Sequence, residues 1–80
     1  MPSSRYLVDR LLRGIDFSRA RDIVELGVGT GCVTREILRR MRPDARLLSL
    51  EINPEFVAMA RQRMPDPRLT LHTACASALP

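Results

Sequence analysis

Hydrophobic positions recur along this chain in two alternating periods, one typical of helices and the other typical of strands. Residues 23–26 are a short apolar run with β-branched members, and three glycines follow within residues 27–31. After the glycines, apolar residues return at every third or fourth position. A buried parallel strand that enters a tight turn and then a helix has this pattern. The glycine turn is therefore the centre of the predicted fold.

The same alternation predicts six elements. The first is an amphipathic helix ended by Gly14, with an apolar stripe of Leu7, Val8, Leu11, Leu12 and Ile15. Strands are expected at residues 21–26, 46–50 and 69–74, with helices between them at residues 31–41 and 54–64. Strands joined by helical crossovers form a parallel sheet with right-handed connections, and the expected strand order is 3-2-1. The predicted fold is α/β, a Rossmann-like three-layer sandwich with the order α-β-α-β-α-β.

Three details of the helices follow from the same pattern. Asp9 and Arg13 are spaced to pair on the first helix. The second helix is expected to turn Arg35, Glu36, Arg39 and Arg40 to solvent. The third helix is expected to be capped by Asn53, with Pro54 at its first position. The residues expected to face inward are Phe56, Val57, Ala60 and Met64.

Length and composition limit the classes of protein that the chain can represent. Its 80 residues allow one domain with a small core, and no apolar run approaches the roughly 20 residues of a membrane span. No secretory signal pattern is present, so the expected location is the cytoplasm. Two cysteines and one histidine are too few for a zinc site of about four ligands, so no metal is expected. His72 lies in an alternating strand pattern and is interpreted as structural.

The net charge is +4, and the first 21 residues carry most of it. Five arginines there outnumber two aspartates, namely Arg5, Arg10, Arg13, Arg19 and Arg21 against Asp9 and Asp16. A solvated basic face explains this excess, and an anionic partner near the N-terminus is the functional alternative. A nucleic-acid-binding domain is disfavoured, because two Phe and one Tyr offer little surface for stacking bases.

The glycines define the expected chemistry. Gly27, Gly29 and Gly31 follow the pattern G-x-G-x-G. In the dinucleotide fingerprint G-x-G-x-x-G the third glycine would fall at Cys32, which argues against a nicotinamide-binding module. A ligand without a pyrophosphate would use the turn for close backbone approach, and an acidic side chain such as Glu25 for its amine. Glu25 ends a buried strand, which is an unfavourable place for a carboxylate without a cation or donors.

A second acid, Glu51, stands at the tip of the neighbouring strand. A carboxylate at this point can accept two hydrogen bonds from a ribose diol. Ile52 follows it and could lie against an adenine face. Three glycines and two acids, spaced as one βαβ unit, together predict a nucleoside-containing cofactor.

These residues resemble a known family. Val24-Glu25-Leu26-Gly27-Val28-Gly29-Thr30-Gly31 is similar to motif I of the class I S-adenosylmethionine-dependent methyltransferases, and Leu48-Ser49-Leu50-Glu51-Ile52-Asn53 is similar to their second motif. The resemblance implies S-adenosylmethionine as cofactor, with the turn under its methionine end and Glu51 on its ribose. Where the family has Gly-Asp-Ala, with the Asp on the adenine amino group, this chain has Ala74-Cys75-Ala76, which places Cys75 at the adenine.

Within the class, the chain resembles bacterial phospholipid N-methyltransferases, which are similar in turn to ribosomal RNA adenine dimethylases. The resemblance is carried by Pro2-Ser3-Ser4-Arg5 before an apolar helix, by residues 24–31, and by the pattern E-x-N-P-E-F at residues 51–56. The family sheet has seven strands, whereas three are predicted here. The chain is therefore expected to comprise an N-terminal helix and linker, residues 1–20, and the cofactor-binding βαβαβ half, residues 21–80, truncated before the substrate-facing half. No catalytic residue is assigned.

The resemblance implies methyl transfer to an amine such as a phospholipid head group. Expected partners are an anionic membrane surface at the inner face of the membrane and, through the open strand edge, further copies of the chain. A ribosomal RNA adenine N-methyltransferase relative, a non-catalytic methyltransferase fragment and a nicotinamide-dinucleotide-binding module are the alternatives.

Overall fold

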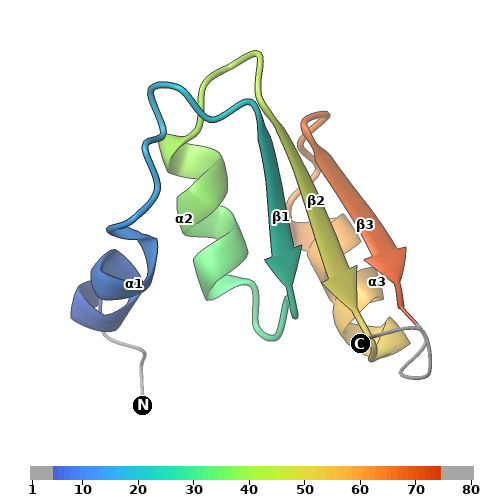
Figure 1. Ribbon diagram of the computed structural model, residues 1–80. Coiled ribbons are helices and arrows are strands. Elements are labelled where there is room, and N and C mark those ends of the chain that lie inside the picture. Colours follow the sequence, from blue (N-terminus) through green and yellow to red (C-terminus); the bar gives the residue numbers. More distant parts are fainter. Residues whose placement is uncertain (1–4, 75–80) are drawn as a thin grey trace.

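The structure is a computed structural model that describes the backbone of residues 5–74 and the side chains of residues 8–74. Figure 1 shows six elements in chain order. They are α1 (Arg5–Leu12), β1 (Asp22–Leu26), α2 (Cys32–Arg40), β2 (Arg46–Glu51), α3 (Pro54–Arg63) and β3 (Leu69–Thr73). The predicted α/β class and element order are confirmed, and the first helix ends before Gly14. No helix in this described part is long and apolar enough to cross a membrane.

The three strands form one parallel sheet in the order β1-β2-β3, which confirms the predicted order. In the register of the sheet, Val24 lies beside Leu48, which lies beside Thr70. Because both crossovers move in the same direction and are right-handed, α2 and α3 pack on the same face. In Figure 1, α3 passes behind β2 and β3. Within the described residues the molecule thus has two layers, the sheet and its helices, of the three that the fold class predicts.

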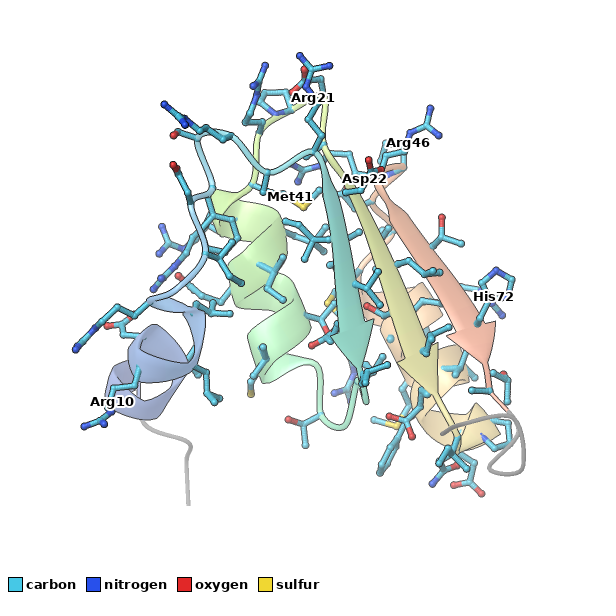
Figure 2. The ribbon with its side chains drawn as sticks, in the orientation of Figure 1. Arg10, Arg21, Asp22, Met41, Arg46 and His72 are labelled. Atoms are coloured by element: carbon cyan, nitrogen blue, oxygen red, sulfur yellow. The ribbon has the colours of Figure 1, made fainter. Side chains whose placement is uncertain are left out.

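The strands are buried on the helix face and open on the other. Ile23 and Glu25 of β1 are buried, whereas Val24 and Leu26 expose 61% and 74% of their surface. The sequence predicts a buried first strand, and the structure corrects this to a strand buried on one side. On β3, His72 lies on the open face and is exposed, as Figure 2 shows.

The hydrophobic core lies between the sheet and the helices. It gathers residues from every helix and from two strands, namely Val8, Leu12, Ile23, Val28, Ile37, Leu38, Met41, Ala45, Leu47, Ala60 and Met64. Leu11 departs from the predicted apolar stripe of the first helix, because 69% of its surface is exposed. The buried stripe of this eight-residue helix contains Val8 and Leu12 and is therefore narrower than the stripe that the sequence predicts.

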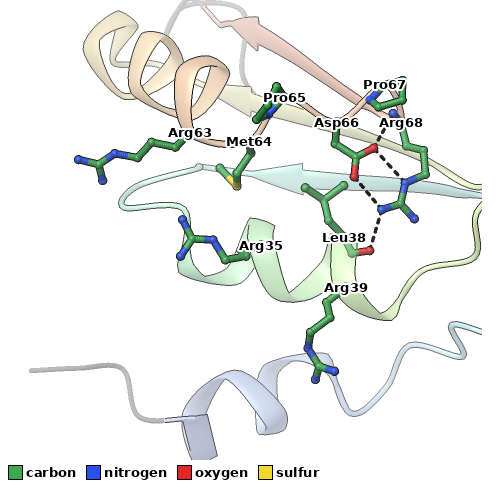
Figure 3. Close-up of a pocket in the computed structure, with 9 residues that line it drawn as sticks. All are labelled: Arg35, Leu38, Arg39, Arg63, Met64, Pro65, Asp66, Pro67 and Arg68. Carbon is green, nitrogen blue, oxygen red and sulfur yellow. Dashed lines mark hydrogen bonds and ion pairs between the residues drawn. The ribbon is translucent and has the colours of Figure 1, made fainter.

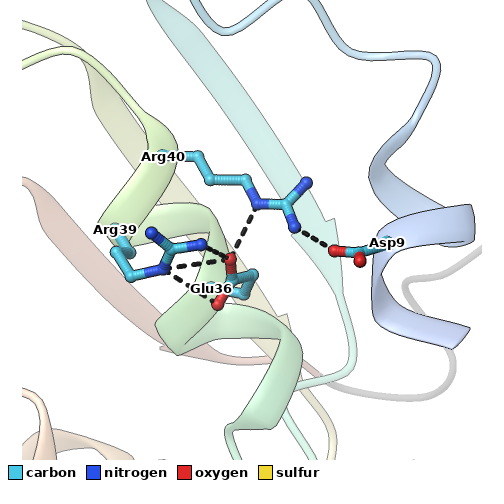
Figure 4. A network of polar contacts seen from close by, with 4 residues as sticks. All are labelled: Asp9, Glu36, Arg39 and Arg40. Carbon is cyan, nitrogen blue, oxygen red and sulfur yellow. Dashed lines mark hydrogen bonds and ion pairs between the residues drawn. The ribbon is translucent and has the colours of Figure 1, made fainter. Parts of the chain in front are cut away.

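An ion-pair network joins α1 to α2 (Figure 4). Arg40 donates to Glu36 through Nε at 2.8 Å and to Asp9 of α1 through its second terminal nitrogen. Arg39 also contacts Glu36, and hydrogen bonds from the two arginines lower the pKa of the Glu36 carboxyl to about 2. Two predictions are corrected here: Asp9 pairs with Arg40 rather than Arg13, and Glu36 and Arg40 are half-buried rather than solvated.

The C-terminal end of α2 is held by Arg68, which precedes β3. Its guanidinium donates to the carbonyl oxygens of Leu38, Met41 and Arg42 at 2.9–3.3 Å. Asp66 fixes the same guanidinium through both carboxylate oxygens, at 3.0 and 2.7 Å. A cation at this place satisfies carbonyls that the helix leaves without an internal partner.

Candidate functional site

The glycine turn joins β1 to α2 at the edge of the sheet where the strands end. Gly27, Gly29 and Gly31 have φ values of +87°, +54° and +89°, a region that other residues rarely adopt. A Cβ atom built at Gly27 or Gly29 would meet no atom within 4 Å. The two glycines therefore present bare backbone to open space, as close approach of a ligand requires. This geometry fits the predicted cofactor turn.

Gly31 has a different surrounding from the other two glycines. It is the N-cap of α2, and a Cβ atom built on it would lie 3.0 Å from Cε of Met64. A side chain here would be strained by the positive φ and would also displace a core methionine. Close packing against Met64 therefore explains why position 31 is a glycine. At Gly27 and Gly29, by contrast, the space beside the backbone is open.

Glu51 lies against this turn. One carboxylate oxygen, Oε1, accepts hydrogen bonds from the backbone N–H groups of Val28 at 2.7 Å and Gly29 at 3.1 Å. The other, Oε2, accepts from the N–H of Asn53 at 2.9 Å. These backbone donors, first that of Asn53 and then those of the turn, lower the pKa of the Glu51 carboxyl from its ordinary value. Glu51 is therefore a fixed negative charge at the end of β2.

The bonds of Glu51 limit what else it can accept. Each carboxylate oxygen has two lone pairs, so Oε1 is saturated by two N–H groups and Oε2 keeps one lone pair. One hydroxyl donor can therefore bind Oε2 directly. For both hydroxyls of a diol to bind, the carboxylate must release one N–H of the turn. The structure thus brings Glu51 and the glycines together, as the sequence predicts, and adds a direct link between them.

Glu25 occupies a separate, buried place under α2. Its Oε1 accepts hydrogen bonds from the hydroxyl groups of Thr34 at 2.6 Å and Ser49 at 2.7 Å. Its Oε2 is buried and has no hydrogen-bond partner among the described residues. Burial is the largest cause of a raised pKa of Glu25, the two hydroxyl donors oppose it, and the charge of Glu51 adds to it. Glu25 therefore joins β1, β2 and α2 and has one oxygen left for a donor.

Sequence reasoning missed both hydroxyl partners of Glu25. Thr34 and Ser49 have no solvent-exposed surface. A signal for each was present: Ser49 is the polar member of an apolar strand, and Thr34 stands at an apolar position of its helix, three residues before Ile37. A buried hydroxyl needs an acceptor, and the buried carboxylate one strand away supplies it.

The remaining candidate residues surround the turn or lie beyond the described part. Ile52 follows Glu51 at the end of β2 and exposes 50% of its surface, so a flat apolar group could rest on it. Cys32, at the start of α2, is exposed, and the hydroxyl of Thr30 donates to its sulfur at 3.4 Å. Cys75, predicted at the adenine, lies outside the described residues.

The comparisons with known proteins agree with this geometry. Residues 23–80 match the family described as "Methyltransferase domain". An ornithine lipid N-methyltransferase of Singulisphaera acidiphila is 44% identical over 62 residues, which are 78% of this chain and 32% of that protein. The ribosomal RNA small subunit methyltransferase A of Alcanivorax borkumensis is 32% identical over 72 residues, which are 90% of this chain and 25% of that protein.

Among solved structures, a dimethyladenosine transferase from Plasmodium falciparum has the same fold. The TM-score is 0.73 at 14% identity, and the match covers 96% of this chain and 28% of that one. The chain therefore spans between a quarter and a third of the length of these relatives. Methyltransferases of this class I fold use S-adenosylmethionine as the methyl donor. With its parallel sheet, its open glycine turn and the match over residues 23–80, the chain belongs to the methyltransferase domain family.

Proposed function

We propose that this chain binds S-adenosylmethionine at the glycine turn and forms the cofactor-binding portion of a methyltransferase that acts on an amine. The contact of Glu51 with the turn carries the proposal. It places a fixed carboxylate, with one free lone pair, beside two glycines whose outer sides are open. A ligand with a hydroxylated sugar and an extended chain fits such a combination.

Each candidate residue has a role in this proposal. Gly27 and Gly29 let the methionine end of the cofactor lie against the backbone, and Gly31 begins α2 behind it. Glu51 accepts a hydrogen bond from the ribose and Ile52 packs on the adenine. Cys75, outside the described residues, is the residue that the family resemblance assigns to the adenine amino group. Glu25, whose carboxylate is buried on the hydroxyl groups of Thr34 and Ser49, supports the turn from beneath and holds β1, β2 and α2 together. When bound, the cofactor supplies the methyl group, and the chain contributes positioning.

The test of cofactor binding is calorimetry with S-adenosylhomocysteine on the wild type and Glu51→Gln. Glutamine keeps the size of the side chain but removes the charge and one acceptor. Loss of a hydrogen bond to a charged group costs about 1.5–3 kcal/mol, so affinity should fall roughly 10- to 100-fold. Glu55→Gln, an exposed carboxylate four residues away, is the matched control and should bind as the wild type does. Equal affinities for Glu51→Gln and the wild type would refute the assignment.

For the methyl acceptor we propose a phospholipid head-group amine. Support for an amine on a lipid comes from the 44% identity to an ornithine lipid N-methyltransferase, against 32% to a ribosomal RNA methyltransferase. The excess of arginine in the first 21 residues agrees with a place at the inner, anionic face of the cytoplasmic membrane, where each cation contributes about 1 kcal/mol. A ribosomal RNA acceptor is the alternative, because the same cations would attract it.

The acceptor test is transfer of labelled methyl from S-adenosylmethionine. The chain, and any longer protein that contains it, would be offered phosphatidylethanolamine vesicles and unmethylated ribosomal subunits in parallel. The proposal predicts label in the lipid. Label in the RNA alone would replace the lipid acceptor with the alternative.

We also propose that copies of the chain associate through the open edge of β1, a proposal supported by the exposed apolar residues of that strand.

A further inference from the structure

A cleft of about 510 Å³ lies between α2 and the segment that follows α3, on the inner side of the glycine turn (Figure 3). Four arginines and one acidic residue are among the described residues that line it. The arginines are Arg35, Arg39, Arg63 and Arg68, and the acid is Asp66. The cleft is shallow and open to solvent, so a ligand there would be bound on one side only.

Two of the four arginines are already neutralised. Arg68 is held by Asp66 and by carbonyls of α2, and both oxygens of Asp66 accept from Arg68. Arg39 contacts Glu36 on its own helix. Among the described residues that line the cleft, Asp66 is the only acid, and because Arg68 engages both of its oxygens it does not balance a further cation.

Arg35 and Arg63 are different. Both are exposed, and within the part of the chain that the structure describes neither guanidinium has a hydrogen bond or an ion pair. In Figure 3 they extend from two different elements at the same end of the cleft, with Met64 between their backbones. We propose that this cleft binds a small organic phosphate monoester, whose phosphate lies between Arg35 and Arg63.

The chemistry of the lining favours this ligand class. A guanidinium donates two parallel hydrogen bonds to a phosphate, and a phosphate monoester carries a charge of about −1.5 to −2 at pH 7, which matches two free cations. The uncharged lining residues are apolar, namely Leu38, Met64, Pro65 and Pro67, so they can pack on the organic part of the ligand. A bare inorganic ion would leave this apolar wall unused.

This site is distinct from the cofactor site. None of the lining residues belongs to residues 25–31 or 51–52. Met64 lines the cleft and packs behind Gly31, so it forms the wall between the cleft and the turn. Binding here is therefore a property additional to the proposed methyltransferase function.

The test is calorimetry with sn-glycerol 3-phosphate on three proteins. Arg35→Gln/Arg63→Gln removes the two free cations, and should lower the affinity about tenfold or more. Arg21→Gln/Arg46→Gln removes the same charge at exposed arginines outside the cleft (labelled in Figure 2), and should change it less than twofold. Thermal unfolding of each variant establishes that it is folded at the temperature of the titration.

A second arm identifies the source of the phosphate. Vesicles of phosphatidylcholine with and without phosphatidic acid present the same glycerol phosphate monoester as a lipid head group. Binding of the soluble ester through Arg35 and Arg63 supports a free metabolite. Binding only to phosphatidic acid vesicles, through the same two arginines, supports a lipid ligand. Absence of binding in both arms, or an equal loss in the two double variants, would overturn the proposal.

Discussion

Glu25 and Glu51 are carboxylates on neighbouring strands, both with little exposed surface, yet their surroundings are opposite. Glu51 accepts three backbone hydrogen bonds, which favour its charged form and lower its pKa. From the residues that the structure describes, Glu25 accepts two hydroxyl hydrogen bonds on one oxygen and none on the other, and burial is the largest influence and raises its pKa. Glu51 is thus a structural charge at the turn, whereas Glu25 is a more easily protonated carboxyl beneath the turn.

The raised pKa of Glu25 predicts how stability depends on pH. An acid with a raised pKa in the folded state disfavours folding once it ionises. This penalty is absent below the ordinary pKa of 4.5 and grows as the pH rises from there through the folded-state pKa. The side chain of Glu25→Gln cannot ionise, so this variant escapes the penalty. The difference between its free energy of unfolding and that of the wild type should therefore increase from pH 4 to pH 8.

Urea unfolding at a series of pH values measures this difference. Glu51 keeps its lowered pKa in both proteins, and its contribution, lost only as the pH falls below 4.5, largely cancels. Glu55→Gln serves as the control, and its curve should run parallel to that of the wild type. Parallel curves for Glu25→Gln as well would show that the buried carboxyl is not destabilised by ionisation.

At the scale of elements, single side chains far from the turn hold the helices in place. Arg68 caps the carbonyl end of α2 from the segment before β3. Arg40 joins α2 to α1 through Asp9. Since α1 has only eight residues, it depends on such tertiary contacts rather than on its own helix propensity.

Removal of the Arg68 cap should destabilise the whole chain. Arg68→Gln loses the hydrogen bonds to three carbonyls and leaves Asp66 without its cation, with an expected cost of about 1.5–3 kcal/mol in the free energy of unfolding. Arg61→Gln removes a more exposed guanidinium with one long hydrogen bond, of 3.4 Å, to Leu71, and should stay within about 0.5 kcal/mol of the wild type. Urea unfolding would contradict the prediction if the two variants lost equal stability.

The contact between Asp9 and Arg40 has a local consequence. Asp9→Asn should speed hydrogen exchange of the α1 amides and leave the amides of the sheet unchanged, because the pair joins α1 to α2 alone. Asp16→Asn, which removes an exposed pair with Arg19, is the control. Uniform faster exchange in both the helix and the sheet would mean that α1 does not open independently.

Much of this arrangement was accessible from the sequence. The strands, the turn and the cap at Asn53 depend on local signals, namely hydrophobic period, glycine and proline, and the structure confirms them. The contacts of Asp9, Glu25 and Arg68 were not predicted. They join residues up to 31 positions apart, and their partners are set by how the helices pack rather than by spacing along one element.

At the scale of the whole molecule, the described sheet has an uncovered face and an unpaired edge. Within residues 5–74, β1 pairs only with β2, so one edge of β1 has backbone groups without a strand partner. On the open face beside this edge, Val24 and Leu26 are mostly exposed, and Leu48 and Leu50 are half-buried. Apolar side chains next to a free strand edge favour pairing with another chain.

The isolated chain should therefore self-associate, with a sedimentation coefficient that rises with concentration in the micromolar range. Val24→Lys places a charge on the open face of β1 and should shift the equilibrium toward monomer, because pairing would bury that charge. Leu11→Lys introduces the same charge on α1, a helix that packs on α2, at a residue that is also mostly exposed, and should associate as the wild type does. A wild type that is monomeric at every concentration would refute self-association, and equal effects of the two lysines would place the contact elsewhere than β1.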